Sequence, residues 1–448
     1  QTSNVSPSCV WSLWLVASSA SPDLSIPPPH NPSPEPNLLE SRRSRNSGIS
    51  AIMSSYASWT TMLNADESTP NPTDTYTTHF KGQKPRILKL DATPLVPGVT
   101  FPRVKQPPSL EVVSKAQKVE SSEQGSSSEA KAAPKAESEK SKAPAWIGLN
   151  GTSFQVRMGP DYAKNKKKAA SKESFYECVG IDCLASPRKI SNIGRYFYPS
   201  DGQEKKSTSK KNPFPEIFIF ALQLPDYAPS MMSSQGDGAG YTIVFHYKLT
   251  EKGRKQIQES KLPAAKVLRK FVKAVRIGGG PQKTEHSMYL RPKVIMRLMN
   301  HEELGLGFVH RKLCENFNAK PFLSRPEHTL HLGGGESSKH YLEIDVDVHR
   351  FKYFQRRCAH SFRDKFCKAE IDIGIVIESH GNQEMPEQML GACRIERLPH
   401  HTFTLVAEEG REEPPTPPSR SPSKRTERPR KEPPPPGSAP PPPPPEKK

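Results

Sequence analysis

The 448 residues include 48 prolines, only 33% are hydrophobic, and the formal net charge is +18. Because the prolines concentrate at the two ends, this composition excludes a chain that is folded from end to end. Residues 146–405 carry 41 basic and 27 acidic residues, so the positive field belongs to the presumed folded unit and favours anionic partners such as acidic lipid headgroups or nucleic acid.

The amino-terminal residues do not form a convincing targeting signal. The chain begins with Gln1, its first methionine is Met53, and the apolar run at 9–20 has no positive charge before it. Twelve residues are also too few to span a bilayer. We interpret residues 1–52 as upstream sequence or a fragment. The seven cysteines are an odd, scattered set, which favours reduced thiols in an intracellular protein. We therefore expect a cytoplasmic protein or one peripheral to a membrane.

Residues 1–145 are predicted to form a disordered amino-terminal arm. From Ser54 onward this arm is rich in Ser, Thr, Pro, Lys and Glu, and it has little apolar surface to bury. One stretch, PRILKLDATPLVPGVTF at 85–101, is more apolar than its surroundings. It is either a docking segment or, as is more common for such stretches, a linker.

The pattern of residues 146–405 predicts one large α+β domain. Many apolar segments alternate with polar residues, which is typical of strands with one buried face. The expected strands lie at 153–158, 175–184, 216–225, 241–249, 290–299, 341–351, 371–379 and 392–398. Since most connections are too short or too polar for a regular βαβ array, we expect a large, mostly antiparallel sheet with flanking helices.

Two helices are predicted inside this domain. The first follows Pro263, a favoured first-turn residue, and carries its apolar and basic side chains on opposite faces. Such a helix either lies on an acidic membrane surface or packs on the sheet with its charges in water. The basic face consists of Lys266, Arg269, Lys270, Lys273 and Arg276. The second helix, at 354–369, places Phe354, Cys358, Phe362 and Phe366 four residues apart, which is typical of a core-facing stripe.

Residues 406–448 are predicted to be a proline-rich disordered tail. Its proline runs favour the polyproline II conformation. The tail is therefore a candidate ligand for an SH3-like or profilin-like partner, or a simple spacer.

The order of several segments resembles a known family. They are Trp146 with FQVR, the lysine-rich turn PDYAKNKKKAAS, then YECVGIDCL, FIFALQLP and VLRKFVKAV, and finally YLEIDVDV, IDIGIVIES and EMPEQMLGACRIERL. In this order and spacing, the last three are the most specific. The chain resembles the plant "enhanced disease resistance 2" C-terminal domain family, long catalogued as a domain of unknown function, over nearly all of residues 146–405.

The resemblance implies lipid-linked or membrane-linked signalling in defence and cell death. In related plant proteins this domain follows pleckstrin-homology and lipid-transfer (START) domains. This chain departs from that architecture, because its first 145 residues are too polar and too broken by proline to fold as either domain. The family supplies no established catalytic residues, and we expect neither a catalytic site nor a cofactor.

Several side chains could nevertheless carry chemistry. Glu343, Asp345 and Asp347 share one face of a strand, and Asp372 and Glu378 are expected on a neighbouring strand. Asp345 and Asp347 are weak candidates for a divalent-cation site; the alternatives are a solvated face or pairing with lysines. The donors His349, Cys358, His360 and Cys367 fit no zinc spacing. Cys178 and Cys183 remain formal candidates for a nucleophile.

Lysines recur in the predicted loops. Lys164, Lys166, Lys167 and Lys168 form one dense cluster, and smaller clusters follow at 188–189 and 205–211. Together with the basic helix face, they are our candidates for binding anionic lipid. The leading hypothesis is thus a non-enzymatic module that binds anionic lipid or a membrane-bound partner. The alternatives are an enzyme with an unrecognised site, or weak nucleic-acid binding, which is disfavoured because no recognisable nucleic-acid motif is present.

Overall fold

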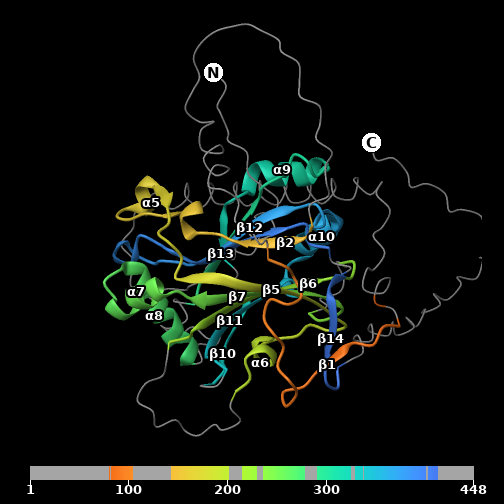
Figure 1. Ribbon diagram of the computed structural model, residues 1–448. Coiled ribbons are helices and arrows are strands. Elements are labelled where there is room, and N and C mark those ends of the chain that lie inside the picture. The colour runs from red at the N-terminus through yellow and green to blue at the C-terminus, as the bar shows by residue number, and fades with distance from the viewer. Residues whose placement is uncertain are drawn as a thin grey trace, which may run out of the picture. The chain divides into compact units, whose positions relative to one another are not determined.

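Two facing β-sheets form the framework of this protein (Figure 1). The computed structural model describes residues 80, 82–103, 143–200, 214–229, 236–277, 290–323, 328–335, 338–399 and 402–411. The larger sheet has the strand order β1-β14-β5-β7-β6-β11-β10. Its strands are β1 (Arg86–Leu88), β5 (Tyr176–Ser186), β6 (Ile217–Pro225), β7 (Gly240–Leu249), β10 (His328–Gly333), β11 (Tyr341–Asp347) and β14 (Thr404–Glu408).

The smaller sheet has the order β2-β13-β12-β8-β9, and all of its strand pairs are antiparallel. Its strands are β2 (Ala145–Gly148), β8 (Pro292–Leu298), β9 (Pro321–Leu323), β12 (Glu370–Ile377) and β13 (Met389–Glu396). A separate hairpin joins β3 (Gln155–Arg157) to β4 (Lys168–Ala170).

The α+β class and all eight expected strands are present, and most strand pairs are antiparallel as expected, but the strands do not form one sheet. The strands divide between two sheets, and the larger one is mixed, with parallel pairs β1–β14, β14–β5 and β11–β6. Parallel neighbours need a long crossover. Between β6 and β11 the chain passes through two strands of the smaller sheet, and local periodicity cannot reveal such a connection.

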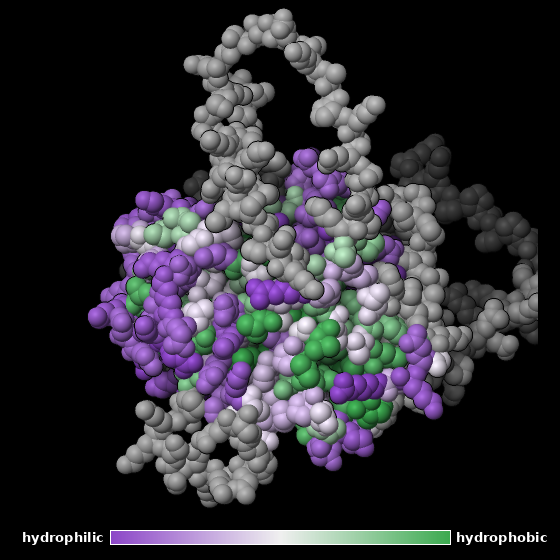
Figure 2. All heavy atoms as spheres, in the orientation of Figure 1, coloured by the Kyte–Doolittle hydropathy of each residue, from purple (hydrophilic) through white to green (hydrophobic). Residues whose placement is uncertain are grey.

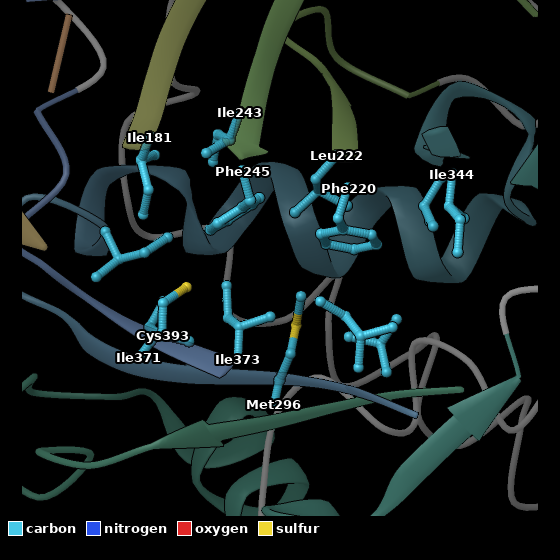
Figure 3. Packing of buried hydrophobic residues seen from close by; sticks show 14 of the residues in the cluster. Ile181, Phe220, Leu222, Ile243, Phe245, Met296, Ile344, Ile371, Ile373 and Cys393 are labelled. Atoms are coloured by element: carbon cyan, nitrogen blue, oxygen red, sulfur yellow. The ribbon is translucent and has the colours of Figure 1, made fainter. Parts of the chain in front are cut away.

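The main core lies between the two sheets (Figure 3). In that view the side chains of Ile181, Phe245 and Phe220 on the larger sheet point toward those of Ile373 and Met296 on the smaller one. All five are buried, with exposed fractions of 4% or less. Alternating apolar residues on both sheets thus meet as the sequence pattern predicts.

The outer face of each sheet is covered as well. On the larger sheet, a second apolar cluster packs under residues 188–199, which include α6 (Gly194–Phe197). On the smaller sheet, a third cluster joins Phe154 and Val156 to Val376 and Met389 beneath the β3–β4 hairpin. Because both faces of each sheet are covered, polar residues of the central strands are buried as well.

Helices lie beside the two sheets. They are α5 (Tyr162–Asn165), α7 (Glu251–Glu259), α8 (Pro263–Arg276), α9 (Phe308–Phe317) and α10 (Tyr353–Phe362). Helix α8 contacts both β10 and β12, so it touches the two sheets together. The predicted stripe on the second helix is confirmed as core, since Phe354, Cys358, Phe362 and Phe366 are all buried. That helix is shorter than predicted, because a 3₁₀ turn replaces it at Arg363–Lys365.

Residues 82–103 come from the predicted amino-terminal arm, yet the structure places them against the sheets. Strand β1 pairs with β14, and the Leu88 and Phe101 side chains are 4% and 3% exposed. These two apolar anchors explain why the segment is ordered. Strand β14 likewise continues past Leu405 to Glu408. Within the described residues, no helix is long and apolar enough to cross a membrane.

The packing between the sheets yields a stability prediction. Phe245 on β7 is fully buried, whereas Lys248 on the same strand is exposed. We expect Phe245→Ala to lower the free energy of unfolding by about 3–5 kcal/mol, because it leaves a cavity between the sheets. The control Lys248→Ala should change it by less than about 0.5 kcal/mol. Urea denaturation measures both, and equal effects would contradict the described packing.

Candidate anion-binding surface

A rigid turn presents the first lysine cluster. Helix α5 ends where Lys166 adopts a left-handed conformation (φ 53°) and its N–H donates to the Tyr162 carbonyl oxygen. The Asn165 Oδ1 accepts a 2.8 Å hydrogen bond from the backbone N–H of Lys167. This turn connects β3 to β4, and its four lysines, Lys164, Lys166, Lys167 and Lys168, are all exposed. The predicted cluster therefore has a defined backbone.

Helix α8 presents the second set of basic side chains. Its first residue is Pro263, as predicted, and Val267, Leu268 and Phe271 are buried in the main core. The opposite face exposes Lys266, Arg269, Lys270, Lys273 and Arg276. Of the two interpretations left open by the sequence, the helix packs within the domain. Its apolar face is already occupied by the core, so only its charged face is available to a partner.

A short 3₁₀ turn, η6 (Asn382–Glu384), brings the two sets together. On one side, the Lys270 ammonium donates to Glu384 Oε1 at 2.6 Å. On the other side, the Asp161 N–H donates to Asn382 Oδ1 at 3.2 Å, and Asn382 Nδ2 lies 3.3 Å from the Asp161 carboxylate. The α5 turn and α8 therefore flank one turn, although about a hundred residues separate them in the sequence.

We call this region the α5–α8 surface and define it as Lys164, Lys166, Lys167, Lys168, Lys266, Arg269, Lys270, Lys273 and Arg276. In Figure 2 the part of the molecule that carries α5, α7 and α8 is largely hydrophilic. All nine residues are exposed. The α5 turn and α8, which carry these nine residues, are thus joined through η6.

Few carboxylates neutralise this surface. Lys270 pairs with Glu384, and the pKa of Glu384 is lowered because hydrogen bonds from His380 N–H and Lys270 outweigh its partial burial. Arg269 instead donates to neutral oxygens of Ile257 and Ser260. Among the described residues, no carboxylate pairs with the remaining lysines of the surface, which are Lys164, Lys166, Lys167, Lys168, Lys266 and Lys273. The result is a local excess of positive charge.

The other predicted lysine clusters do not add to this surface. The Lys189 ammonium donates to Asp347 Oδ2 at 2.5 Å, and Arg188 pairs with Asp237 at 3.1 Å. Both are therefore neutralised locally. The cluster at 205–211 lies outside the described residues, as does the proline-rich tail beyond Arg411.

The acidic face of β11 is buried, not solvated. Alternation along this strand is confirmed, because Ile344 points into the main core while Glu343 and Asp345 face residues 188–199. Glu343 accepts hydrogen bonds of 2.8 Å from the N–H groups of Ile193 and Gly194. Its carboxylate therefore holds the covering segment on the sheet.

Asp345 and Asp347, the weak metal candidates, are likewise engaged by protein donors. Asp345 Oδ2 accepts from Ser191 Oγ at 3.1 Å and from the Asn192 N–H at 3.0 Å, and it lies 3.2 Å from His331 Nε2. Burial, reinforced by the neighbouring Asp345, raises the pKa of Glu343 well above its usual range. Across the described part of the chain, no group of three or more His, Cys, Asp or Glu is arranged to hold a metal ion.

Asp372 and Glu378 lie on or after β12 in the smaller sheet, so the expectation that they neighbour the β11 carboxylates is wrong. Asp372 is fully buried and pairs with Arg297 at 2.6 Å and Arg394 at 2.5 Å. Glu378 pairs with Arg291 at 2.7 Å. Asp372 and Glu378 therefore form ion pairs with arginines. The sequence alone could not distinguish them from unpaired surface charges.

The candidate nucleophiles are buried thiols. Burial raises the pKa of both Cys178 and Cys183 well above the usual range, which disfavours the reactive thiolate. Two small pockets accompany the fold. The charged side chains in their linings form ion pairs, namely Glu387 with Lys293 at 2.7 Å and Arg363 with Asp226 at 2.7 Å.

The chain was also compared with known protein families. The family described as Protein ENHANCED DISEASE RESISTANCE 2, C-terminal, matches residues 146–399. These residues contain the whole α5–α8 surface, the β11 carboxylates and most of both sheets. No curated protein and no solved structure matches the chain.

Buried His349 generates a prediction about pH. Its Nδ1 lies 3.1 Å from the Tyr227 hydroxyl, and burial, together with the nearby Lys189 and Arg356 cations, lowers its pKa to about 3 despite Asp237. In the unfolded chain this histidine binds a proton near pH 6.5, whereas in the folded protein it stays neutral down to about pH 3. The free energy of unfolding must therefore fall as the pH falls through this window.

We expect His349 to account for a loss of about 2 kcal/mol between pH 7 and pH 5. In His349→Gln that part of the loss should vanish, whereas the half-buried control His340→Gln should keep it. Urea denaturation at both pH values measures the difference, and an identical loss in all three proteins would show that His349 is not held neutral.

Proposed function

This chain belongs to the Protein ENHANCED DISEASE RESISTANCE 2, C-terminal, family, and from that premise we propose that its domain is a non-enzymatic module that binds anionic lipid surfaces. The observation that carries the proposal is the α5–α8 surface. Its basic residues lie on the α5 turn and on α8, two elements far apart in the sequence that both contact η6. Most of its lysines have no carboxylate partner within the described residues.

The expected strength of this attachment follows from the number of unpaired lysines. A lysine close to an anionic membrane surface contributes about 1 kcal/mol. The six lysines that have no carboxylate partner would therefore contribute about 6 kcal/mol if all act together, which corresponds to a Kd of about 0.04 mM. The attachment is weak and reversible, as suits a protein that visits the cytoplasmic face of a membrane without being anchored in it.

The packing of α8 determines the kind of contact. An amphipathic helix that lies in a membrane buries its apolar face among the lipids. In this protein Val267, Leu268 and Phe271 are already buried in the core. The α5–α8 surface would therefore meet the headgroups by electrostatic attraction alone, and binding should weaken steeply as salt screens the charges.

The choice of a binding module over an enzyme rests on the polar groups of the domain interior. Buried carboxylates such as Asp345 and Asp372 accept hydrogen bonds from neighbouring groups. The buried thiols of Cys178 and Cys183 have raised pKa values. Such groups favour a structural role, so the surface is the better candidate for function.

Charge reversal tests the proposal. We expect the full chain to float with vesicles of phosphatidylcholine containing about 30% phosphatidylserine. Reversing Lys166, Lys167 and Lys168 to Glu should reduce the bound fraction at least about tenfold, since six units of charge change at the membrane. The matched control reverses Lys84, Arg86 and Lys368, which are exposed residues outside the α5–α8 surface.

The control variant should bind nearly as well as the unmodified chain, and raising the salt from about 0.05 to 0.5 M should release both from the vesicles. Equal losses in the two variants would show that only total charge matters. Undiminished binding at high salt, or equal binding to neutral vesicles, would contradict an electrostatic contact.

Glu384 offers a test in the opposite direction. Its carboxylate neutralises Lys270 at the centre of the α5–α8 surface. We expect Glu384→Gln to strengthen vesicle binding by up to about fivefold, because one negative charge is removed from the α5–α8 surface. The comparison variant Glu409→Gln removes a carboxylate from the exposed Lys89 pair near β14 and should have little effect. Weaker binding after Glu384→Gln would place the lipid contact elsewhere.

A further inference from the structure

Residues 82–103 follow an extended path along the domain, and they lie outside the 146–399 range of the family match. At one end β1 adds a parallel edge strand next to β14. Further along, the Leu95 N–H donates to the Tyr196 carbonyl oxygen at 2.8 Å. At the other end Arg103 forms a bridge with Trp146 of β2. The segment thus makes the backbone contacts of a peptide laid on a preformed surface.

The centre of this path is a buried carboxylate. Asp182 on β5 is 1% exposed. Its Oδ2 accepts the Gly98 N–H at 2.6 Å, and its Oδ1 accepts the Val99 N–H at 3.1 Å, the Thr100 N–H at 2.9 Å and the Thr100 hydroxyl at 3.0 Å. The Thr100 Oγ1 in turn accepts the Cys183 N–H at 2.7 Å. One side chain of the domain therefore receives three consecutive backbone donors.

The domain orients this carboxylate from behind. His246 on β7 is fully buried, and its Nε2 lies 3.0 Å from Asp182 Oδ2. Hydrogen bonds from Gly98 and Thr100, together with His246, lower the pKa of Asp182 despite the burial that would raise it. The Asp182 side chain is thus held in its charged form, in which it accepts hydrogen bonds.

The contacts also select for particular residues in the segment. Gly98 has φ +78°, and a Cβ at this position would lie 2.9 Å from the Cα of Gly180. The Phe101 side chain is 3% exposed, and its carbonyl oxygen accepts the Trp146 Nε1–H at 3.2 Å. A matching peptide therefore needs glycine, then any residue, then a hydroxyl side chain and an aromatic ring.

Other side chains of the segment contribute little to this contact. Leu90, Val96 and Val99 are 60%, 66% and 69% exposed. Moreover, Arg103 and Trp146 are bridged neighbours, yet the chain between them runs through residues 104–142. The position of the segment is consequently set by its contacts, since so long a connection does not by itself impose it.

Phe101 also forms an antiparallel bridge with Ile181. We propose that Asp182, Ile181, Tyr196 and Trp146 form a peptide-binding site, and that residues 94–103 are its ligand in cis. We call it the Asp182 groove. Its ligand class is an extended peptide with the Pro-Gly-x-Thr-Phe pattern of residues 97–101. Of the two interpretations of the 85–101 stretch, this is the docking segment. A peptide with the same pattern from another protein would bind the Asp182 groove when residues 94–103 are displaced from it.

The test separates the ligand from the site within the full chain. A recognition sequence for a specific protease is inserted among residues 104–142, and the purified protein is cleaved. We expect the two pieces to remain together during size-exclusion chromatography at micromolar concentration. A fluorescently labelled synthetic peptide of residues 82–103 should then replace the cleaved amino-terminal piece on the domain. The fluorescence anisotropy of the peptide should rise, because the bound peptide tumbles more slowly. The uncleaved chain should bind it at least about tenfold more weakly, because the tethered segment competes.

Peptide variants provide matched controls without changing the protein. Gly98→Ala introduces a methyl group against Gly180, and Thr100→Val removes the hydroxyl at the carboxylate; each should weaken binding at least about tenfold. Val99→Ala alters an exposed side chain between them and should stay within about twofold. In the protein, Asp182→Asn should weaken every peptide.

Three results would overturn the proposal. Pieces that never exchange, or a cleaved protein that aggregates, would show that the segment is an inseparable part of the fold. Separation of the pieces with no anisotropy change would show that the groove has no affinity for the peptide. Equal binding of the Gly98→Ala, Thr100→Val and Val99→Ala peptides would show that the contact has no sequence preference.

Discussion

Buried carboxylates organise this domain. Among the described residues, eight carboxyl side chains are buried, compared with three lysines and arginines: the carboxyls are Asp182, Asp226, Glu343, Asp345, Asp347, Asp372, Glu387 and Glu408, and the cations are Lys293, Arg356 and Arg363. A buried carboxylate is costly unless donors surround it. Here those donors are backbone N–H groups of covering segments, or lysine and arginine side chains. The carboxylates therefore fix what covers each sheet: Glu343 holds residues 193–194, and Asp182 holds residues 98–100.

This internal use of acidic residues bears directly on the surface. A carboxylate that is buried inside the fold is not available to the exposed lysines of the α5–α8 surface. Among the described residues, most lysines of the α5–α8 surface therefore have no carboxylate partner. The cations near the buried acids, such as Lys189 and Arg394, are neutralised instead. The proposed lipid contact thus follows from how the fold satisfies its interior.

Local periodicity predicted much of the fold and less of the site. The strands, the start of α8 and the Phe354 stripe follow from spacing, because each depends on neighbours within a few residues. The division into two sheets, the parallel β6–β11 pair and the burial of Glu343 depend on partners more than a hundred residues away. The nine basic residues were identified in two groups. The two groups come close because η6 lies between the α5 turn and α8. No sequence pattern specifies this arrangement.

Hydrogen exchange of the full chain, with and without anionic vesicles, tests the central claim most directly. If lipid meets the outward charges of a domain whose core stays closed, exchange should slow at residues 162–170 and 382–384 at low salt and recover at high salt. The buried amides of α8 should remain as protected as in the free protein. Faster exchange throughout α8, or protection confined to other faces, would contradict an attachment made by side chains alone.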